Sequence, residues 1–542
     1  MFLDSIPEPQ GERAHSLLEK QAASRIAARD SSVFGLPEDD AAHARSFMGW
    51  TNLAVEPPVE PADIDAFASA VREEGLDDIV LIGQGGSSQA PMTMASLLDR
   101  AGELPVGFHT MDSLASDDVR GVLEAIDPER TLFIVSSKSG STIEPNAIFS
   151  CVWGWLHEQL GDDAGNRFVA ITDPGSKLEE RAGELGFRAV FNGEPTVGGR
   201  FSALSVFGLV PFACMGVNVA ALIDRCAEVE RLCGLDTMDN PALRLAGFVS
   251  DNRADGRDKI AFHFDGGSEA LGFWLEQLIA ESLGKNGRGI LPNTEPDDSL
   301  LARPHDDRCA VLYALEAPED DAAAGSLAAD DVPFDAVKIY IARPEDVALH
   351  FVVWEHAVSL LGVDLGVNPY DQPDVESTKR NVRALLFDDD ASAAPHVAAT
   401  VRTDDAIIEI SDALCSDDEL PEDEDAALEL LLASIRPGDY FSINAFVPYD
   451  EGLEQLRHEV ADVYGCASCL EMGPRYLHSI GQLHKGGPDT GVFLIVSADQ
   501  PDDLQVPGQS FALGELATAQ AYGDFAALNA NGRRAVHIHH LL

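Results

Sequence analysis

The chain is 542 residues long, too long for one ordinary hydrophobic core, so several structural units are expected. Hydrophobic residues make up 45% of it and charged residues 24%, a composition that excludes an intrinsically disordered protein. There are 92 acidic and 37 basic residues, and the net charge of −55 disfavours nucleic acid and anionic lipid as partners. No apolar run reaches the roughly 18 residues of a membrane span, and the N-terminus lacks the features of a signal peptide. We therefore expect a soluble, cytoplasmic protein with no nucleic-acid or membrane partner.

The eight cysteines are scattered through the chain, which predicts reduced thiols. Cys466 and Cys469 form a CxxC pair, a pattern that can be half of a zinc site or a redox pair. No second CxxC and no suitably spaced histidine pair accompanies it. We therefore expect neither a metal ion nor another cofactor.

The first half of the chain alternates between helix-like and strand-like segments. Residues 1–60 are expected to be helical and then irregular, and residues 63–74 form an amphipathic helix pattern. The run DIVLIG (78–83) is almost continuously apolar, which is typical of a strand buried on both faces. Similar runs begin near residues 106, 131 and 167, with helix-like segments between them. This alternation predicts a parallel sheet with helices on both faces over residues 61–215.

The same pattern restarts after residue 216 and predicts a second α/β unit over residues 216–400. Its expected strands begin near residues 258, 309 and 335, and its expected helices span residues 273–284, 346–361 and 375–386. Residues 401–542 are expected to form a smaller C-terminal α/β unit, with strands near residues 440, 491 and 534. The acidic stretch 317–331 is expected to be a surface loop, and the acidic run 416–425 a boundary or the solvated start of a helix.

A glycine-rich turn, GQGGSS (83–88), directly follows the first predicted strand. Glycines there let the backbone approach a ligand closely, and the N-terminus of the next helix favours an anion. The spacing is not GxGxxG, and a simple tight turn explains it equally well when it is taken alone.

A hydroxyl-rich turn, SSKSGST (136–142), follows the third predicted strand and is followed by Glu144. Hydroxyls and helix N–H groups are well suited to binding a phosphate. The alternative is a helix cap with Glu144 as the capping-box acid. Capping would explain one or two of the five hydroxyls, so phosphate binding is favoured.

Two further residues are candidates for a catalytic role, although the local sequence around each is less specific. Arg200 lies in the turn VGGRFS (197–202), where it can stabilise developing negative charge, or it is an ordinary surface arginine. Glu281 follows the apolar helix FWLEQLIA and can act as a general base, or it is an ordinary glutamate in the last turn of a helix.

Taken together and in order, these motifs resemble the phosphoglucose isomerase family. The set comprises GxGGSS, SKSGST with Glu144, VGGRFS, ESLGK (281–285) and NPYDQPDVESTK (368–379). The segment PRYLHSIGQLHKGGPDTG (474–491) is similar to the isomerase half of bifunctional transaldolase/phosphoglucose isomerase proteins. The resemblance implies two sugar-isomerase (SIS) type doubly wound parallel-sheet domains followed by the smaller C-terminal unit. It also implies interconversion of glucose 6-phosphate and fructose 6-phosphate through a cis-enediolate, without a cofactor.

The resemblance assigns roles to individual residues. Glu281 is implied as the base, Arg200 as the group that stabilises the enediolate, and Lys379 as a group near the ring oxygen of the sugar. Lys138 is implied to bind through its backbone. The residues implied to bind the substrate are Gly86, Ser87, Ser137, Lys138, Ser139, Thr142, Gly199, Gln277 and Gln372.

The ring-opening histidine is harder to assign. Bacterial relatives carry it in a TDLHSxGQ motif after the base, whereas here the similar sequence YLHSIGQ (476–482) lies near the C-terminus. We therefore assign His478, delivered within one chain or across the interface of a homodimer, and keep His305 and His484 as alternatives. In the C-terminal run HIHH, metal binding is disfavoured because strand alternation points His539 away from His540.

Several departures from the family pattern leave the substituent at C6 of the sugar open. Gln84, Gln89, Ser139, Gly140 and Leu283 replace residue types that are usual in the family. The alternatives are therefore an isomerase of mannose 6-phosphate or of the sulfonated sugar sulfoquinovose, and a non-catalytic sugar-phosphate sensor.

Overall fold

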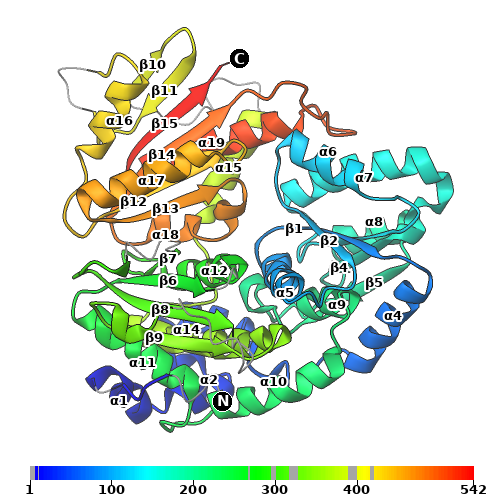
Figure 1. Ribbon diagram of the computed structural model, residues 1–542, viewed down its shortest axis with the longest axis horizontal. Coiled ribbons are helices and arrows are strands. Elements are labelled where there is room, and N and C mark those ends of the chain that lie inside the picture. The colour runs from blue at the N-terminus through cyan, green and yellow to red at the C-terminus, as the bar shows by residue number, and fades with distance from the viewer. Residues whose placement is uncertain are drawn as a thin grey trace.

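The computed structural model describes residues 6–9, 11–265, 269–294, 301–315, 327–387, 399–415 and 420–541. Three β-sheets occupy three corners of the molecule, and helices α5 (Gln89–Arg100) and α12 (Glu269–Glu276) pack against each other between the first two (Figure 1). The predicted α/β class is confirmed. Most of the acidic stretch 317–331 and the residues 416–419 lie outside the described residues.

The first sheet has the strand order β2-β1-β3-β4-β5, and all of its pairs are parallel. Alternate residues of β1 enter different cores, with Ile79 and Leu81 on one face and Val80 and Ile82 on the other, as expected for a strand buried on both faces. The strands are β1 (Asp78–Gly83), β2 (Gly107–Met111), β3 (Thr131–Ser136), β4 (Phe168–Thr172) and β5 (Ala189–Asn192). The remaining helices of this unit are α4 (Pro61–Glu73), α6 (Ser116–Ala125), α7 (Ile143–Leu160), α8 (Lys177–Glu184) and α9 (Val206–Cys214).

The second sheet is also fully parallel, in the order β7-β6-β8-β9. Its strands are β6 (Lys259–Asp265), β7 (Leu291–Thr294), β8 (Arg308–Leu315) and β9 (Ala336–Ile341). Its other helices are α10 (Val219–Cys233), α11 (Pro241–Ala254) and α14 (Val347–Leu365), whereas α15 (Val375–Phe387), the next helix in the chain, packs against α19 (Leu513–Ala530) of the third unit. Within the described residues, one helical segment, Pro344–Leu365, has the length and hydropathy of a membrane span, but 94% of that window is buried inside the protein. Its apolar composition is accounted for by packing in the core.

The third sheet is mixed, in the order β10-β11-β15-β14-β12-β13, and its last four strands are parallel. It has more strands than either other sheet, although its unit was expected to be the smaller one. The strands are β10 (Ala399–Arg402), β11 (Ala406–Ile410), β12 (Tyr440–Phe446), β13 (Ala467–Met472), β14 (Gly491–Ala498) and β15 (Arg534–His540). The helices are α16 (Glu424–Leu432), α17 (Glu451–Tyr464), α18 (Gly481–Gly486) and α19 (Leu513–Ala530).

The N-terminal segment packs against the second unit through α1 (Glu12–Glu19) and α2 (Ala22–Ala27), and α3 (Glu38–Ser46) follows. The ring of Trp50 stacks on Phe201 at 4.9 Å and approaches Tyr370 at 6.2 Å. The N-terminal segment therefore packs, through Trp50, against Phe201, which follows Arg200 in the same turn.

One expectation needs correction. The helix expected over residues 273–284 is α-helical only to Glu276 and continues as a π-helix over Gln277–Glu281. Such wide turns have no periodicity signature of their own and are often found at functional sites. The CxxC pair lies at and within β13, where residues three apart point to opposite faces, so Cys466 and Cys469 enter different cores.

Candidate active site

Two glycine turns from different parts of the chain lie against each other. Gly85 begins a short 3-10 turn after β1 with φ +54°. A Cβ on Gly86 would lie 2.1 Å from the carbonyl oxygen of Gly199, and one on Gly85 would lie 2.8 Å from Nε2 of Gln277. No other residue type fits at either position without moving its neighbours. This close approach explains why both positions are glycine. Ser87, in the same turn, is buried as well.

The hydroxyl-rich turn follows β3, which is hydrogen-bonded to β1, so both turns lie at the same edge of the sheet. Ser137 is buried, and its hydroxyl has no partner among the described residues. Within the described residues, Thr142 precedes α7 without a side-chain capping bond, and the Ser139 hydroxyl bonds to Ser141 alone, with 2.9 Å between the two hydroxyl oxygens. Gly140 has φ +63°, a conformation that favours glycine. The turn thus offers free hydroxyls at the N-terminus of an 18-residue helix.

Lys138 turns its side chain away from this edge. Its Nζ lies 2.5 Å from Oδ2 of Asp173 and 3.1 Å from the carbonyl oxygen of Glu194. The side chain is therefore engaged by Asp173 and Glu194, and binding through the backbone of Lys138 stays a prediction.

Arg200 is buried and held from several sides, so it is not a surface arginine. Its side chain is 3% exposed, and its Nη1 lies 3.3 Å from Oε1 of Glu281. The guanidinium also donates to the Ser282 hydroxyl at 2.8 Å, the Pro369 carbonyl at 2.7 Å, the Asp371 carbonyl at 2.9 Å and the Gln372 side chain at 3.0 Å. Side chains and carbonyls therefore fix the guanidinium beside a carboxylate.

Glu281 ends the π-helical segment that Gln277 begins. The Gln277 side chain donates from Nε2 to Oε2 of Glu281 at 3.2 Å, and the Glu281 side chain is 11% exposed. The two side chains therefore meet across the widened turn, while the other carboxylate oxygen faces Arg200.

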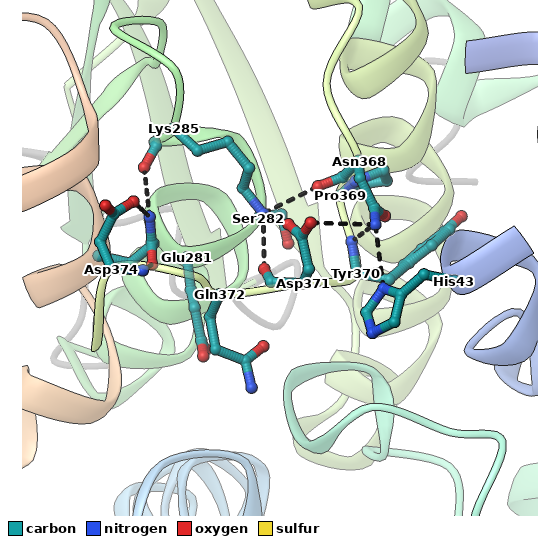
Figure 2. Close-up of polar contacts among 12 residues, drawn as sticks. His43, Glu281, Ser282, Lys285, Asn368, Pro369, Tyr370, Asp371, Gln372 and Asp374 are labelled. Atoms are coloured by element: carbon teal, nitrogen blue, oxygen red, sulfur yellow. Dashed lines mark hydrogen bonds and ion pairs between the residues drawn. The ribbon is translucent and has the colours of Figure 1, made fainter. Parts of the chain in front are cut away.

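A second buried cation holds the loop that carries Gln372. Figure 2 shows Lys285 reaching the turn between Asn368 and Asp371. Its Nζ lies 2.8 Å from the Asn368 carbonyl, 2.6 Å from the Asp371 carbonyl and 2.7 Å from Oδ1 of Asp371. Burial, with a contribution from Arg200, lowers the pKa of Lys285 to about 8. Lys285 lies in the ESLGK motif, but the local sequence does not indicate this supporting role.

His478 pairs with Glu144. The Nε2 of His478 lies 3.0 Å from Oε1 of the buried Glu144, which also accepts from Nε2 of Gln520 at 2.5 Å. Glu144 is therefore not a capping-box acid, which corrects that alternative. Burial opposes the charged form of His478, but the Glu144 carboxylate outweighs it and raises the pKa of His478. The His478 side chain is 23% exposed, and both partners come from the same chain.

Lys379 lies on α15 with an exposed side chain, close enough to His478 for its charge to act on the imidazole. Gln372 is exposed as well, apart from its bond to Arg200. The structure thus brings Glu281 and Gln372 into direct contact with Arg200, and it places His478 against Glu144, which follows the hydroxyl-rich turn.

The alternative histidines lie elsewhere. His484 is buried, with its ring 4.7 Å from that of Phe493, and burial lowers its pKa well below the usual value. His305 lies ahead of β8, with its ring 5.6 Å from that of Phe334.

In the C-terminal run HIHH, the nearest nitrogens of His537 and His539 each lie 2.8 Å from Oγ of Ser497, whereas His540 lies 3.8 Å from Glu424. No cluster that could hold a metal is found among the described residues.

Comparison with known proteins finds similarity to one enzyme family over part of the chain. A model described as "Phosphoglucose isomerase" matches residues 68–290, which include Gly86, Arg200 and Glu281 but end before Lys379 and His478. Glucose-6-phosphate isomerase of Rubrobacter xylanophilus is 29% identical over 368 residues, 59% of this chain and 84% of that protein. The same enzyme of Staphylococcus saprophyticus is 27% identical over 385 residues, 63% of this chain and 87% of that protein.

Solved structures give the same result for the fold. A glucose-6-phosphate isomerase from Chlamydia trachomatis superposes with a TM-score of 0.53 at 18% identity, over 67% of this chain and 83% of that one. A hypothetical protein from Thermus thermophilus superposes with a TM-score of 0.57 at 26% identity, over 68% of this chain and 94% of that one. The chain is therefore similar to the phosphoglucose isomerase family, and the part that matches the family model, residues 68–290, holds the glycine turns, Arg200 and Glu281.

Proposed function

We propose that the protein interconverts glucose 6-phosphate and fructose 6-phosphate through a cis-enediolate. The observation that carries this proposal is the contact of Glu281 with Arg200, at 3.3 Å in a buried setting. Moving a proton between C1 and C2 needs a base, and the enediolate formed on the way needs a positive group. Glu281 is the base, and Arg200 stabilises the negative oxygen.

The hydroxyl-rich turn is the proposed phosphate site. The buried hydroxyl of Ser137 has no partner in the described part of the chain, Thr142 makes no capping bond there, and the first N–H groups of α7 add a positive field. Ser87, Ser139 and the backbone of Lys138 complete the proposed cradle. These local donors hold a dianion in a protein whose overall charge is strongly negative.

Ring opening is assigned to His478 with Lys379. Glu144 favours the charged form of His478, so an N–H is available to protonate the ring oxygen of the cyclic sugar. Lys379 lies near it, and Gln277 and Gln372 line the site with Gly86 and Gly199. Every one of these groups comes from one chain, so a second copy is not needed to deliver His478.

The alternatives concern the substrate. A hydroxyl-rich cradle fits a sulfonate as well as a phosphate, which keeps sulfoquinovose and mannose 6-phosphate as candidate substrates. A non-catalytic sensor is disfavoured because binding alone does not need a base, a guanidinium and a ring-opening pair in one place. We further propose, on the family resemblance, a cytoplasmic homodimer.

The test is a coupled assay. The purified protein is given fructose 6-phosphate, and glucose 6-phosphate is detected with a dehydrogenase. The same amount of protein is then assayed with mannose 6-phosphate and sulfoquinovose. Preference for the glucose 6-phosphate pair supports the proposal, a preference for another sugar moves it to that substrate, and binding without turnover of any substrate favours a sensor.

A further inference from the structure

Helix α19 of the C-terminal unit bonds to residues that hold both proposed ring-opening groups, His478 and Lys379, in place. It carries Gln520 and Asp524, which are four residues apart and hence on one face of the helix. Gln520 bonds to Glu144, the partner of His478. Asp524 bonds to the two segments that carry His478 and Lys379.

Asp524 is fully buried and accepts three hydrogen bonds. Its Oδ2 accepts from the hydroxyl of Tyr476 at 2.8 Å. Its Oδ1 accepts from the hydroxyl of Thr378 at 3.3 Å and from Nζ of Lys485 at 2.5 Å. The Lys485 side chain is 1% exposed and that of Asp524 0%, so the pair is shielded from water. A buried carboxylate with three donors is fixed in position.

The donors are close neighbours of the reactive groups in the chain. Tyr476 lies two residues before His478 in the same 3-10 turn, and Thr378 directly precedes Lys379 on α15. One carboxylate therefore fixes two segments that are about a hundred residues apart in the sequence. The spacing between His478 and Lys379 follows from this shared acceptor.

The backbone supports the same arrangement. Helix α15 packs against α19, as Figure 1 shows at the top of the molecule. Asn381 donates to the carbonyl of Gly523 at 3.0 Å, and a Cβ on Gly523 would lie 2.9 Å from Cγ2 of Val382. The glycine next to Asp524 lets the two helices approach closely enough for the bond to Thr378.

We propose that Asp524 is a positioning residue for ring opening, and that the C-terminal unit contributes to the reaction through α19. This inference rests on the proposed function. Asp524 is fully buried and bonded to Tyr476, Thr378 and Lys485, so it does not touch the substrate, and the proton transfer at C1 and C2 is assigned to Glu281. Its loss should therefore affect cyclic substrates and spare open-chain ones.

The test uses two conservative variants, Tyr476→Phe and Thr378→Val, each of which removes one hydroxyl from Asp524 and leaves the ion pair with Lys485 intact. Two rates are measured for each variant. One is kcat/KM for glucose 6-phosphate, which is cyclic in solution. The other is deuterium exchange at C2 of a four-carbon aldose phosphate, which cannot close a ring through its phosphorylated hydroxyl. We expect the first rate to fall by about tenfold, because small displacements of catalytic groups are costly, and the second to change by less than about twofold.

The matched control is Tyr313→Phe. Tyr313 is also fully buried, and its hydroxyl accepts a hydrogen bond from Trp354 at 2.7 Å in the second unit. It should leave the ratio of the two rates unchanged. Asp524→Asn serves as the severe variant, but it leaves Lys485 buried beside a neutral group and should lower the melting temperature.

The outcomes separate this inference from the proposed function. A wild-type protein without isomerase activity would contradict the proposed function itself. An active wild type, with both rates falling equally in Tyr476→Phe and Thr378→Val, would show that Asp524 acts on the general structure and would overturn the inference. Unchanged rates in both variants would overturn it as well.

Discussion

Replacing Glu281 with Gln should abolish most of the isomerase activity while keeping the site assembled. The amide has the shape of the carboxylate and still accepts from Gln277, which lies 3.2 Å away. It loses the charge that faces Arg200 and the ability to take a proton. Loss of a general base lowers kcat by about 10²–10⁴-fold, or roughly 3–5 kcal/mol of transition-state stabilisation.

The fold should tolerate this change because Arg200 keeps its other acceptors. Ser282, Gln372 and the carbonyls of Pro369 and Asp371 remain within 2.7–3.0 Å of the guanidinium. We expect the affinity for fructose 6-phosphate, measured by calorimetry, to change by about threefold at most, since the phosphate contacts are untouched.

The control is Glu355→Gln. Burial raises the pKa of Glu355 well above its usual value, which favours the uncharged form, and the amide has the same shape. The coupled assay should find this variant as active as the wild type. Turnover of Glu281→Gln within about threefold of wild type, well short of the loss expected for a base, would refute the assignment of Glu281.

Three further predictions concern the phosphate cradle, ring opening and the buried lysine. Ser137→Ala and Thr142→Ala should each raise KM for fructose 6-phosphate by about tenfold or more, because bonds to a charged group are strong, while kcat falls less; an unchanged KM would count against the cradle. Since Glu144 raises the pKa of His478, the imidazole stays protonated above its usual range, and kcat/KM for glucose 6-phosphate should decline only as pH rises through that raised value. Glu144→Gln should move this decline to lower pH, and a pH profile that does not move would be the contrary result. Lys285→Met should lower kcat by about tenfold or more by releasing the loop that holds Gln372 against Arg200, and fully retained activity would show that the loop needs no such support.

The interior of each sheet was predictable because strands buried on both faces are nearly continuously apolar. β1, β3, β4, β6, β8, β12 and β14 all follow this rule. Four of the five strands that the sequence did not reveal, β5, β7, β10 and β13, lie at sheet edges. Edge strands are short and partly exposed, as in the alternating burial of β5, so their patterns are weak.

The site was predictable where local motifs carry it and not where distant partners do. Glu144 lies where a capping acid is expected, yet its partner His478 is 334 positions away. Gln520 and Asp524 are ordinary polar residues of a helix when viewed alone, and only the packing of α15 and α19 gives them a role. Local patterns contain no information on such contacts.

The most direct test of the account is the isomerisation of fructose 6-phosphate in heavy water, followed by NMR. Proton transfer through an enediolate by one base, Glu281, predicts that glucose 6-phosphate forms with some deuterium at C2, and that Glu281→Gln loses conversion and deuterium incorporation together. Conversion by Glu281→Gln at the wild-type rate, or no conversion by the wild type, would contradict the account.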